Sequence, residues 1–457
     1  MFWTVIYNIF FVPVLWLIKQ VMKLINPKVK ERERNWKGLL LQFEKIKRDE
    51  HSKYIWFHAS SMGEFEQAKP IIEMLKKNNK DVKIIVTFYS PSGYNNQKNY
   101  KYADAFLYMP FDSISGAKKI IKLIKPDLAV FVRYEIWRNH LWILKQSSIP
   151  TYLICATAPR NKLLRKILLI GSLMKSNYNL FDKIYTASET ETKQFRKMKI
   201  NTELMTASDT RFDRIVEKAN ESRQKQIIPP EMFKGDSSTS LRMTFVLVAG
   251  STWDADEDII IDTVKQFEKE NHEAIRLILV PHEPTEKHIE KVKHKLPNSF
   301  LLSEILNFLS FKRDENEIKN FLGWNHIIVD SIGHLLSLYS LADAAYIGGG
   351  FGAGVHSVTE PAGYGIPLAT GIKFHNSPDA VSLHKLGGLE IIKNKDDFYE
   401  WLKKLLEATE LKNELGLKAI HYVNKHTGST KLIVDEIASV LNKSTKVPPS
   451  LCSGQAL

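Results

Sequence analysis

The chain has 457 residues, which is too long for one ordinary core and indicates two or three domains. Apolar residues form 44% of it and charged residues 25%, a composition that excludes a disordered or fibrous protein. The net charge of +13 favours an acidic partner, such as nucleic acid, anionic lipid or a phosphorylated substrate. Only Cys155 and Cys452 are present, which argues against a disulfide framework or a cysteine-rich metal site and favours a reducing compartment.

The N-terminus predicts a membrane anchor over residues 1–25. Met1–Ile18 has no charged side chain, and a basic stretch follows it. The apolar run is short for a span and contains Pro13, so a tilted single span and a helix lying in the interface both remain open. A buried first helix of a soluble protein is the alternative. The charges follow the apolar run, which disfavours a cleaved signal peptide and places the rest of the chain on the cytoplasmic face.

Strands alternate with helices along the rest of the chain, which predicts parallel sheets covered by helices on both faces. The expected strands of the first half are Tyr54–Ala59, Val82–Phe88, Asp127–Val132 and Pro150–Ala156, and those of the second half are Phe245–Ala249, Ala274–Val280, Ile327–Val329 and Ala344–Ile347. The sequence therefore predicts an α/β fold of two tandem domains facing a cleft. The expected division is an N-terminal domain at 26–220, a linker at 221–241, a C-terminal domain at 242–443 and a loose tail at 444–457.

The first segment that carries chemistry runs from His58 to Glu64. An expected strand ends there, a glycine turn follows, and a helix opens with Glu64. Ligands of open α/β sheets collect at the carboxyl ends of strands, so this turn is expected to line the cleft. The alternative role of Glu64 is structural, because a carboxylate in the first turn of a helix complements the macrodipole.

The second segment is the glycine-rich stretch from Ile347 to Ala362, which joins a strand end to a helix start. Glycines allow close approach to an anion, and backbone N–H groups donate to phosphate oxygens, so the segment predicts a nucleotide-phosphate site. It is neither a Walker loop nor a dinucleotide fingerprint. Glu360 is expected to bind a ribose diol, and Ser251 and Thr252 at an earlier strand end are expected to belong to the same site.

Seven segments of the chain, in order, resemble the patterns of the transferases of 3-deoxy-D-manno-octulosonic acid (Kdo). They lie at 58–64, 133–139, 209–213, 250–252, 280–284, 330–335 and 354–361. For example, His-Ala-Ser-Ser-Met-Gly-Glu at 58–64 is similar to the family's His-Ala-x-Ser-x-Gly-Glu, and Asp-Thr-Arg-Phe-Asp at 209–213 is similar to its Lys-Phe-Asp step. Each motif is weak by itself, but the ordered set is specific and covers nearly the whole chain.

The resemblance implies a GT-B glycosyltransferase of two Rossmann-like domains that moves Kdo from CMP-Kdo to a lipid A precursor (lipid IVA) in lipopolysaccharide core biosynthesis. It implies an inner-membrane protein whose N-terminal half holds the acceptor and whose C-terminal half holds CMP-Kdo, with no metal or cofactor. Matched by position, Glu64 is the catalytic base and Arg211 stands at a lysine that stabilises the transition state, with Arg133 and Glu135 as further catalytic candidates. The expected CMP-binding residues are Ser251, Thr252, Pro281, His282, Ile332, Gly333, His334, Ser357, Val358, Thr359 and Glu360.

The chain departs from the family at several charged positions. Arg133 replaces the first of two carboxylates, His282 replaces an arginine and His334 replaces a glutamate. Thr157–Pro159 stands where the family has Arg-Leu-Ser, with Arg160 nearby as an unaligned substitute. These changes indicate a divergent branch in which the cation positions are redistributed, and they leave a changed acceptor preference open.

Two other functions remain open. One is a different nucleotide-sugar GT-B glycosyltransferase acting on another cell-envelope lipid. The other is a membrane-tethered nucleotide-binding module, but no nucleic-acid-binding motif accompanies the positive charge, and the basic residues are spread along expected solvated helix faces. Nucleic acid is therefore not an expected partner.

Overall fold

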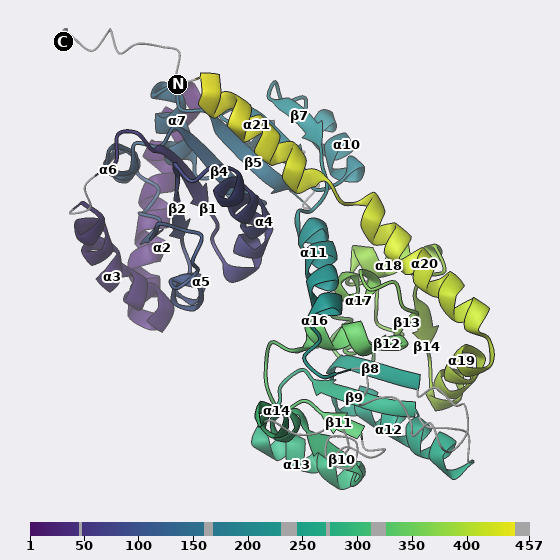
Figure 1. Cartoon of the computed structure of the whole chain (residues 1–457). Coiled ribbons are helices and arrows are strands. Elements are labelled where there is room, and N and C mark those ends of the chain that lie inside the picture. Colours follow the sequence, from purple (N-terminus) through teal and green to yellow (C-terminus); the bar gives the residue numbers. More distant parts are fainter. Residues whose placement is uncertain (45–47, 160–167, 230–244, 271–274, 312–325, 444–457) are drawn as a thin grey trace, which may run out of the picture. The chain divides into compact units, whose positions relative to one another are not determined.

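The computed structural model describes residues 1–44, 48–159, 168–229, 245–270, 275–311 and 326–443. The chain forms two compact units (Figure 1). The first comprises Met1–Asp213 together with the C-terminal residues from Thr427, and the second comprises Arg214–His426. Each unit contains one seven-stranded parallel sheet. The predicted fold class of two tandem α/β domains is confirmed.

The first sheet has the strand order β3-β2-β1-β4-β5-β6-β7. Its strands are β1 (Lys53–His58), β2 (Val82–Phe88), β3 (Ala105–Tyr108), β4 (Leu128–Val132), β5 (Thr151–Ala156), β6 (Lys183–Thr186) and β7 (Glu203–Thr206). The order reverses between β1 and β4, whose register pairs His58 with Phe131. A ligand site is expected at such a switch point, beyond the carboxyl ends of the two strands.

Helices cover both faces of this sheet because its strands are apolar on both sides. One face packs against α4 (Met62–Asn78) and α21 (Ser429–Lys443), which lie side by side in Figure 1. The other face packs against α3 (Pro27–Glu44), α6 (Ile114–Ile124), α7 (Arg138–Gln146), α9 (Leu168–Tyr178) and α10 (Glu189–Lys197). The short helix α5 (Pro91–Gln97) follows β2 and also contacts α4.

The N-terminal segment consists of α1 (Phe2–Ile6), one π-helical turn η1 (Tyr7–Phe11) and α2 (Val12–Ile25). Among the described helices, Phe2–Ile25 alone is long and apolar enough to cross a membrane, with a mean hydropathy of 1.7. Its polar side chains nevertheless contact the first unit. Tyr7 Oη donates to Asp112 Oδ2 at 2.9 Å, and Asn8 Nδ2 donates to Asn139 Oδ1 at 2.7 Å. The first turns of this segment therefore lie against the protein, while Leu24 near its end is 85% exposed.

The second sheet has the strand order β10-β11-β9-β8-β12-β13-β14. Its strands are β8 (Phe245–Thr252), β9 (Ile275–Pro281), β10 (Ser299–Leu301), β11 (His326–Ile328), β12 (Ala344–Ile347), β13 (Leu368–Gly371) and β14 (Glu390–Ile392). The switch point lies between β8 and β12. The helices are α12 (Asp254–Lys269), α13 (Glu286–Lys295), α14 (Leu302–Ser310), α16 (Leu335–Leu338), η3 (Tyr339–Leu341), α17 (Thr359–Ala362), α18 (Pro378–Lys385), α19 (Lys395–Glu407) and α20 (Thr409–Lys425). Of these, α12, α13 and α19 pack on one face of the sheet.

The domain boundaries differ from the expected ones. Helix α11 (Arg211–Gln224) runs through the expected end of the N-terminal domain at residue 220, and the two units divide inside it, after Asp213. The expected C-terminal domain of 242–443 loses its last helix, because α21 buries Ile433, Val434 and Ile437 in the core of the first unit. Most of the expected linker, the tail from 444 with Cys452, and Arg160 lie outside the described residues.

Candidate functional site

The catalytic candidates of the first unit lie at the switch point of its sheet. Glu64 is in the first turn of α4, which follows β1, while Arg133 and Glu135 directly follow β4. Because β1 and β4 are neighbours, the residues after their carboxyl ends share one edge of the sheet. The structure thus brings together three of the four predicted catalytic residues.

Glu135 is the centre of a buried hydrogen-bonded cluster. Glu135 is 9% exposed. Its Oε2 accepts hydrogen bonds from His58 Nε2 at 3.1 Å, from Trp137 Nε1 at 2.6 Å and from the Ser60 hydroxyl. Burial by itself raises the pKa of Glu135, but the donors outweigh burial, led by His58, and the pKa is lowered from its ordinary value. Glu135 is therefore a fixed anion at neutral pH.

Glu64 has the opposite electrostatic environment. The half-buried side chain forms a capping box with Ser61, whose backbone N–H donates to Glu64 Oε2 at 2.9 Å. Burial raises the pKa of Glu64, and the negative charge of Glu135 raises it further. Among the described residues, no hydrogen bond is made to Oε1 of Glu64. The structural role considered for Glu64 is thus real, and it leaves one carboxylate oxygen available for a proton.

Arg133 is held in a strained backbone conformation at the end of β4. Its φ is +64°, in the left-handed region that non-glycine residues seldom adopt, and its N–H donates to the Ile154 carbonyl at 2.8 Å. The guanidinium lies over the Tyr134 ring, 4.9 Å from its centroid. Among the described residues no carboxylate forms an ion pair with Arg133. The side chain is consequently a cation available to an anionic ligand.

Arg211 lies at the N-terminus of α11 and is paired with Asp209. Its Nε donates to Asp209 Oδ1 at 3.1 Å and its Nη2 donates to Oδ2 at 2.7 Å. The Arg211 side chain is 47% exposed, so the guanidinium also faces solvent. Asp209 Oδ2 accepts from Gln67 Nε2 at 2.6 Å, and Gln67 is on α4, one turn from Glu64. This chain of contacts connects the fourth predicted catalytic residue to the helix that carries Glu64.

The glycine-rich loop of the second unit follows β12, beside the end of β8. A Cβ on Gly348 would lie 2.2 Å from the Ser251 carbonyl oxygen, so only glycine allows this approach. Gly349 has a φ of +91°, and its N–H donates to the buried carboxylate of Asp256 at 2.9 Å. Ser251 is itself left-handed, with a φ of +55°. The predicted link between the loop and the Gly250–Thr252 step is therefore a direct packing contact.

Three rings stack beside this loop, and only one of them was among the predicted site residues. The rings of His282 and His356 lie 4.2 Å apart and nearly parallel, at 17°, and the Trp253 ring lies 4.8 Å from that of His282. Trp253 Nε1 donates to His356 Nε2 at 3.0 Å. Burial lowers the pKa of His356, and so does neighbouring His282. The stack brings rings that follow β8, β9 and β12 together in one aromatic surface.

The other predicted CMP-binding residues divide by exposure. The side chains of Thr252, Pro281 and Val358 are buried, so they shape the edge and offer a ligand little more than backbone. Exposed or half-buried positions are Ser251, His282, Ile332, Gly333, His334, Ser357, Thr359 and Glu360. Helix α17 has only four residues, so its dipole contributes little to the binding of phosphate. The backbone of the glycine-rich loop is the larger source of donors.

Lys373 is a cation that the motif comparison did not find. It follows β13, its backbone N–H donates to the Gly350 carbonyl at 2.8 Å, and its Nζ donates to the Gly352 carbonyl at 3.0 Å. No carboxylate of the described residues pairs with it. The sequence could have indicated Lys373 only by its position two residues after an apolar strand, because ligands of parallel sheets bind at the carboxyl ends of strands. Lys373 supplies positive charge beside the loop, although His282 replaced the family's arginine.

A group of Asp254, Glu257 and His288 has the composition of a cation site, with potential ligand atoms within 4.8 Å of one another. Its members are already paired, since His288 Nε2 lies 2.9 Å from Glu257 Oε1 and Nζ of neighbouring Lys291 lies 2.6 Å from Asp254 Oδ2. Thr252 Oγ1 also donates to Glu257 Oε1 at 3.0 Å. The contacts describe an ion-pair network that fixes the start of α12 and the end of β8.

The architecture matches known nucleotide-sugar proteins. UDP-GlcNAc 2-epimerase from Neisseria meningitidis, solved with UDP-GlcNAc, superposes with a TM-score of 0.57 at 13% identity and covers 84% of this chain and 100% of its own. At that identity the likeness concerns the fold alone. Two Rossmann-like sheets with candidate residues at their carboxyl edges define the class of the protein as a GT-B fold.

The sequence comparisons identify the family. The sequence profile of the 3-deoxy-D-manno-octulosonic-acid transferase (kdotransferase) family matches residues 34–214. The 3-deoxy-D-manno-octulosonic acid transferase of Rickettsia typhi (strain ATCC VR-144 / Wilmington) is 26% identical over 401 residues, which are 87% of this chain and 80% of that protein. The enzyme of the same name from Aquifex aeolicus (strain VF5) is 27% identical over 80% of this chain and 88% of its own. The chain is therefore similar to Kdo transferases over most of its length, and its first unit matches the profile of that family.

Proposed function

We propose that the protein transfers Kdo from CMP-Kdo to a lipid A precursor during lipopolysaccharide core biosynthesis. The substrate class rests on the relatives, which are named as Kdo transferases and align over most of their own length. The observation that carries the mechanism is the pair of carboxylates at the β1–β4 switch point. The pKa of Glu64 is raised and that of Glu135 is lowered, so the two acids are assigned different tasks.

Glu64 is the general base of the proposed transfer. Its carboxylate removes the proton of an acceptor hydroxyl while the oxygen of that hydroxyl bonds to the anomeric carbon of Kdo. The bond from that carbon to the phosphate oxygen breaks, and CMP leaves with the electron pair. A raised pKa makes Glu64 a stronger base than an ordinary carboxylate, and Oε1 is the oxygen without a hydrogen bond to a described residue.

Charge stabilisation is assigned to the arginines and to the glycine-rich loop. Arg211 would stabilise the negative charge that grows on the departing phosphate, while Arg133 would bind a phosphate group of the acceptor. The loop N–H groups and Lys373 would bind the phosphate of the donor, and the surface of Trp253, His282 and His356 would border its nucleoside. The proposal includes no metal or cofactor, so EDTA added after the donor has been generated is expected to leave turnover unchanged.

The proposed site of action is the cytoplasmic face of the inner membrane, because the acceptor is a lipid and the N-terminal helix exposes apolar side chains. Val14, Leu17 and Leu24 are 56%, 60% and 85% exposed, an arrangement that a soluble core helix does not have. The polar contacts of Tyr7 and Asn8 with the first unit favour a helix lying in the membrane interface over one that leaves the protein to cross the bilayer.

The decisive experiment is mass analysis of a reaction with the purified full-length protein, a tetra-acylated lipid A precursor and CMP-Kdo generated in the reaction. We expect an added Kdo mass on the lipid and release of CMP. A parallel reaction with UDP-GlcNAc as the donor tests the alternative that the protein is a different nucleotide-sugar glycosyltransferase. Transfer from UDP-GlcNAc, with none from CMP-Kdo, would overturn the proposal. Binding of CMP without transfer to any lipid would favour the nucleotide-binding module.

A further inference from the structure

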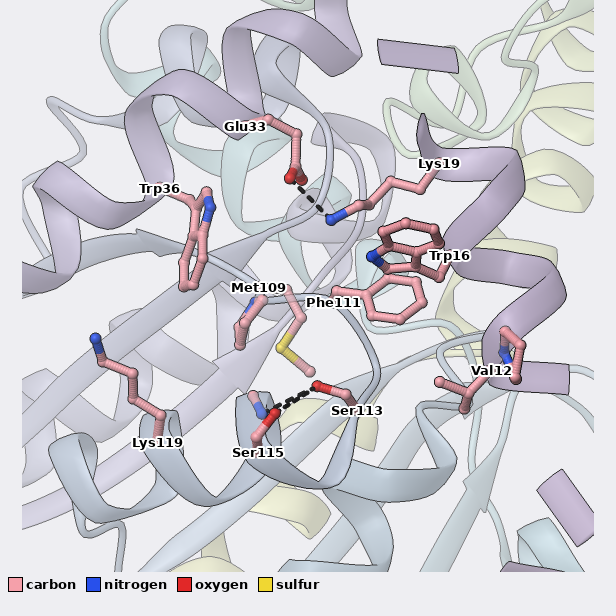
Figure 2. Close-up of a pocket in the computed structure, with 13 residues that line it drawn as sticks. Val12, Trp16, Lys19, Glu33, Trp36, Met109, Phe111, Ser113, Ser115 and Lys119 are labelled. Carbon is pink, nitrogen blue, oxygen red and sulfur yellow. Dashed lines mark hydrogen bonds and ion pairs between the residues drawn. The ribbon is translucent and has the colours of Figure 1, made fainter. Parts of the chain in front are cut away.

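A cavity of about 640 Å³ lies in the first unit, between the N-terminal helix and the sheet (Figure 2). Its walls include Trp16 of α2, Trp36 of α3, Phe111 after β3 and Ser115 of α6. The volume is in the range of about 300–1,000 Å³ that is usual for small-molecule sites. None of the residues assigned above to catalysis or to CMP lines it.

The interior of the cavity is apolar, and one wall is open. Met109 at its base is 1% exposed, whereas Trp16 is 51% exposed because no other described part of the chain covers it. Pro13, from the same helix, also lines the cavity. The helix that forms this wall presents its other apolar side chains to the surroundings, as Leu24 does. An apolar chain could therefore pass from a bilayer into the cavity along α2.

Positive charge accompanies this apolar interior. Lys19 and Lys119 both line the cavity, and Figure 2 shows them on opposite sides of it. Lys19 Nζ is paired with Glu33 Oε2 at 3.0 Å. Lys119 is exposed and forms no ion pair or hydrogen bond with any described residue. An apolar chamber with an available ammonium group at its edge fits an anionic amphiphile better than an uncharged apolar ligand.

The cavity lies on the same edge of the sheet as Glu64. Its base is formed by Met109–Phe111, which directly follow the carboxyl end of β3. In the strand order β3-β2-β1, two spacings separate that end from the end of β1, which leads into Glu64. Neighbouring strands are about 4.8 Å apart, so the two strand ends are separated by about 10 Å. An acylated sugar with its hydroxyl at Glu64 can span this separation with its chain.

We propose that this cavity receives one acyl chain of the lipid acceptor and that Lys119 attracts the anionic end of the same molecule. The inference rests on the proposed function, since it concerns the acceptor of that reaction. It makes the cavity a determinant of acceptor affinity that is separate from the residues of the chemical step. A phospholipid of the surrounding bilayer and an ordinary apolar solute are the competing occupants.

The test fills the cavity with a side chain. Ser115 is exposed on α6 and lines the cavity, so Ser115→Phe should occupy it without disturbing the core. Ile114→Phe, at an exposed neighbour that does not line the cavity, is the matched control. For Ser115→Phe we expect KM for the acylated acceptor to rise about tenfold, with kcat unchanged. KM for a deacylated acceptor with the same phosphates, and vesicle binding, should stay within about twofold of wild type.

Direct binding of the acylated acceptor, measured without donor, separates this inference from the proposed function. If wild type binds the acceptor and Ser115→Phe does not, but neither transfers Kdo, the cavity assignment stands and the proposed reaction fails. If both transfer Kdo with equal KM, the cavity assignment fails alone. Weaker vesicle binding by Ser115→Phe with an unchanged acceptor KM would assign the cavity to bulk phospholipid and would likewise overturn the inference.

Discussion

Gln67 donates a hydrogen bond of 2.6 Å from its Nε2 to Oδ2 of Asp209, and this contact joins two segments that the sequence separates widely. Asp209 in turn binds the guanidinium of Arg211. Gln67 and Glu64 are three residues apart on α4, a spacing that places their side chains as neighbours, with Cβ atoms about 5–6 Å apart. Glu64, the proposed base, and Arg211, which is proposed to stabilise the transition state, therefore belong to one connected cluster of the first unit.

Arg211 should contribute more to turnover than to donor affinity. Replacing it with alanine is expected to lower kcat at least tenfold and to change CMP affinity by less than about threefold, because charge on the leaving phosphate develops fully only in the transition state. Steady-state kinetics together with CMP binding by calorimetry provide the measurement. Arg211→Lys is the matched control and should recover most of kcat. A loss of CMP affinity as large as the loss of kcat would contradict the assignment.

Glu64→Gln is expected to fold normally, bind CMP and lose turnover by about 10²–10⁴-fold, because proton removal contributes about that much. Glutamine also serves at this position of a capping box, so the start of α4 should persist. The raised pKa of Glu64 means that its charged form is unfavourable in the folded state. The melting temperature of the variant at pH 7 should consequently equal or exceed that of wild type. Substantial remaining turnover would remove Glu64 from the mechanism.

The pH dependence of turnover gives a second measurement on Glu64. Activity should fall as the pH decreases through the raised pKa of Glu64, because the protonated acid cannot accept the proton. Glu135→Gln removes a negative charge that raises this pKa, so the acidic limb of the profile should move to lower pH. The pKa of Glu135 itself is lowered, and its contribution to stability is present at neutral pH and lost as the pH falls through that lowered pKa. If the acidic limb of the profile does not move in Glu135→Gln, the charge of Glu135 does not raise the pKa of the group that controls turnover.

Arg133→Ala should raise KM for a phosphorylated acceptor about tenfold or more and should have a smaller effect on an acceptor that lacks the phosphate. A guanidinium without a carboxylate partner among the described residues is suited to bidentate binding of phosphate. Comparison of the two acceptors in steady-state assays is the measurement, and Arg133→Lys tests the need for the planar group. An equal rise in KM for both acceptors would show that Arg133 has a structural role in the strained turn after β4.

Lys373→Ala should weaken binding of CMP about threefold to tenfold, because its ammonium is the cation beside the glycine-rich loop. The difference from wild type should shrink as salt is added, since screening reduces the contribution of an exposed charge. Calorimetric titration with CMP at two salt concentrations measures both effects. Lys393→Ala, at an exposed lysine of the same unit, is the control and should bind as wild type does. Equal affinity in all three proteins would exclude Lys373 from the donor site.

The apolar surface of α2 should control association with vesicles independently of folding. Leu24→Glu places a charge on a side chain that is 85% exposed, and we expect weaker co-sedimentation with anionic vesicles and an unchanged melting temperature. Leu417→Glu, at a position 66% exposed in the second unit, should leave vesicle binding unaltered.

Deletion of residues 1–25 should act differently from Leu24→Glu. It removes Thr4, a hydrogen-bond partner of the buried Arg138, and it also removes Asn8, the partner of Asn139. The melting temperature should therefore fall along with vesicle binding, because buried polar groups would lose partners. A deletion that leaves the melting temperature unchanged would show that these contacts contribute little to stability.

Much of the fold was predictable because the central strands are continuous apolar runs. Val82–Phe88 was expected with the bounds that the structure has, and Tyr54–Ala59 differs from β1 by one residue at each end. Such runs are buried on both faces of a parallel sheet and give a strong local signal. The short strands β3 and β14 were not expected, because they are partly exposed and their apolar pattern is weak. The equally short strands β11 and β12 are fully buried, and both were expected.

The site was predictable only where a motif marked it. Glu64, Arg133 and Glu135 were expected, and the structure places them at one sheet edge. Trp253 and Lys373 were not expected as site residues, because each becomes part of the site through contacts with other strands, namely the rings after β9 and β12 and the carbonyl of Gly352. The pKa shifts also depend on three-dimensional neighbours, so the opposite pKa shifts of Glu64 and Glu135 could not follow from the sequence.

The position of α21 makes the folding of the first unit depend on a helix that is synthesised after the second unit. Its Ile433, Val434, Ile437 and Leu441 complete the hydrophobic core around α4 and leave the ribosome after the other described core residues of the first unit. About 200 residues are synthesised between the first part of this unit and α21, which takes roughly 10–40 s at about 5–20 residues per second. During that interval the face of the sheet beside α4 is incomplete. A nascent chain stalled before Ser429 should accordingly present an apolar surface to chaperones, and one released after Lys443 should not.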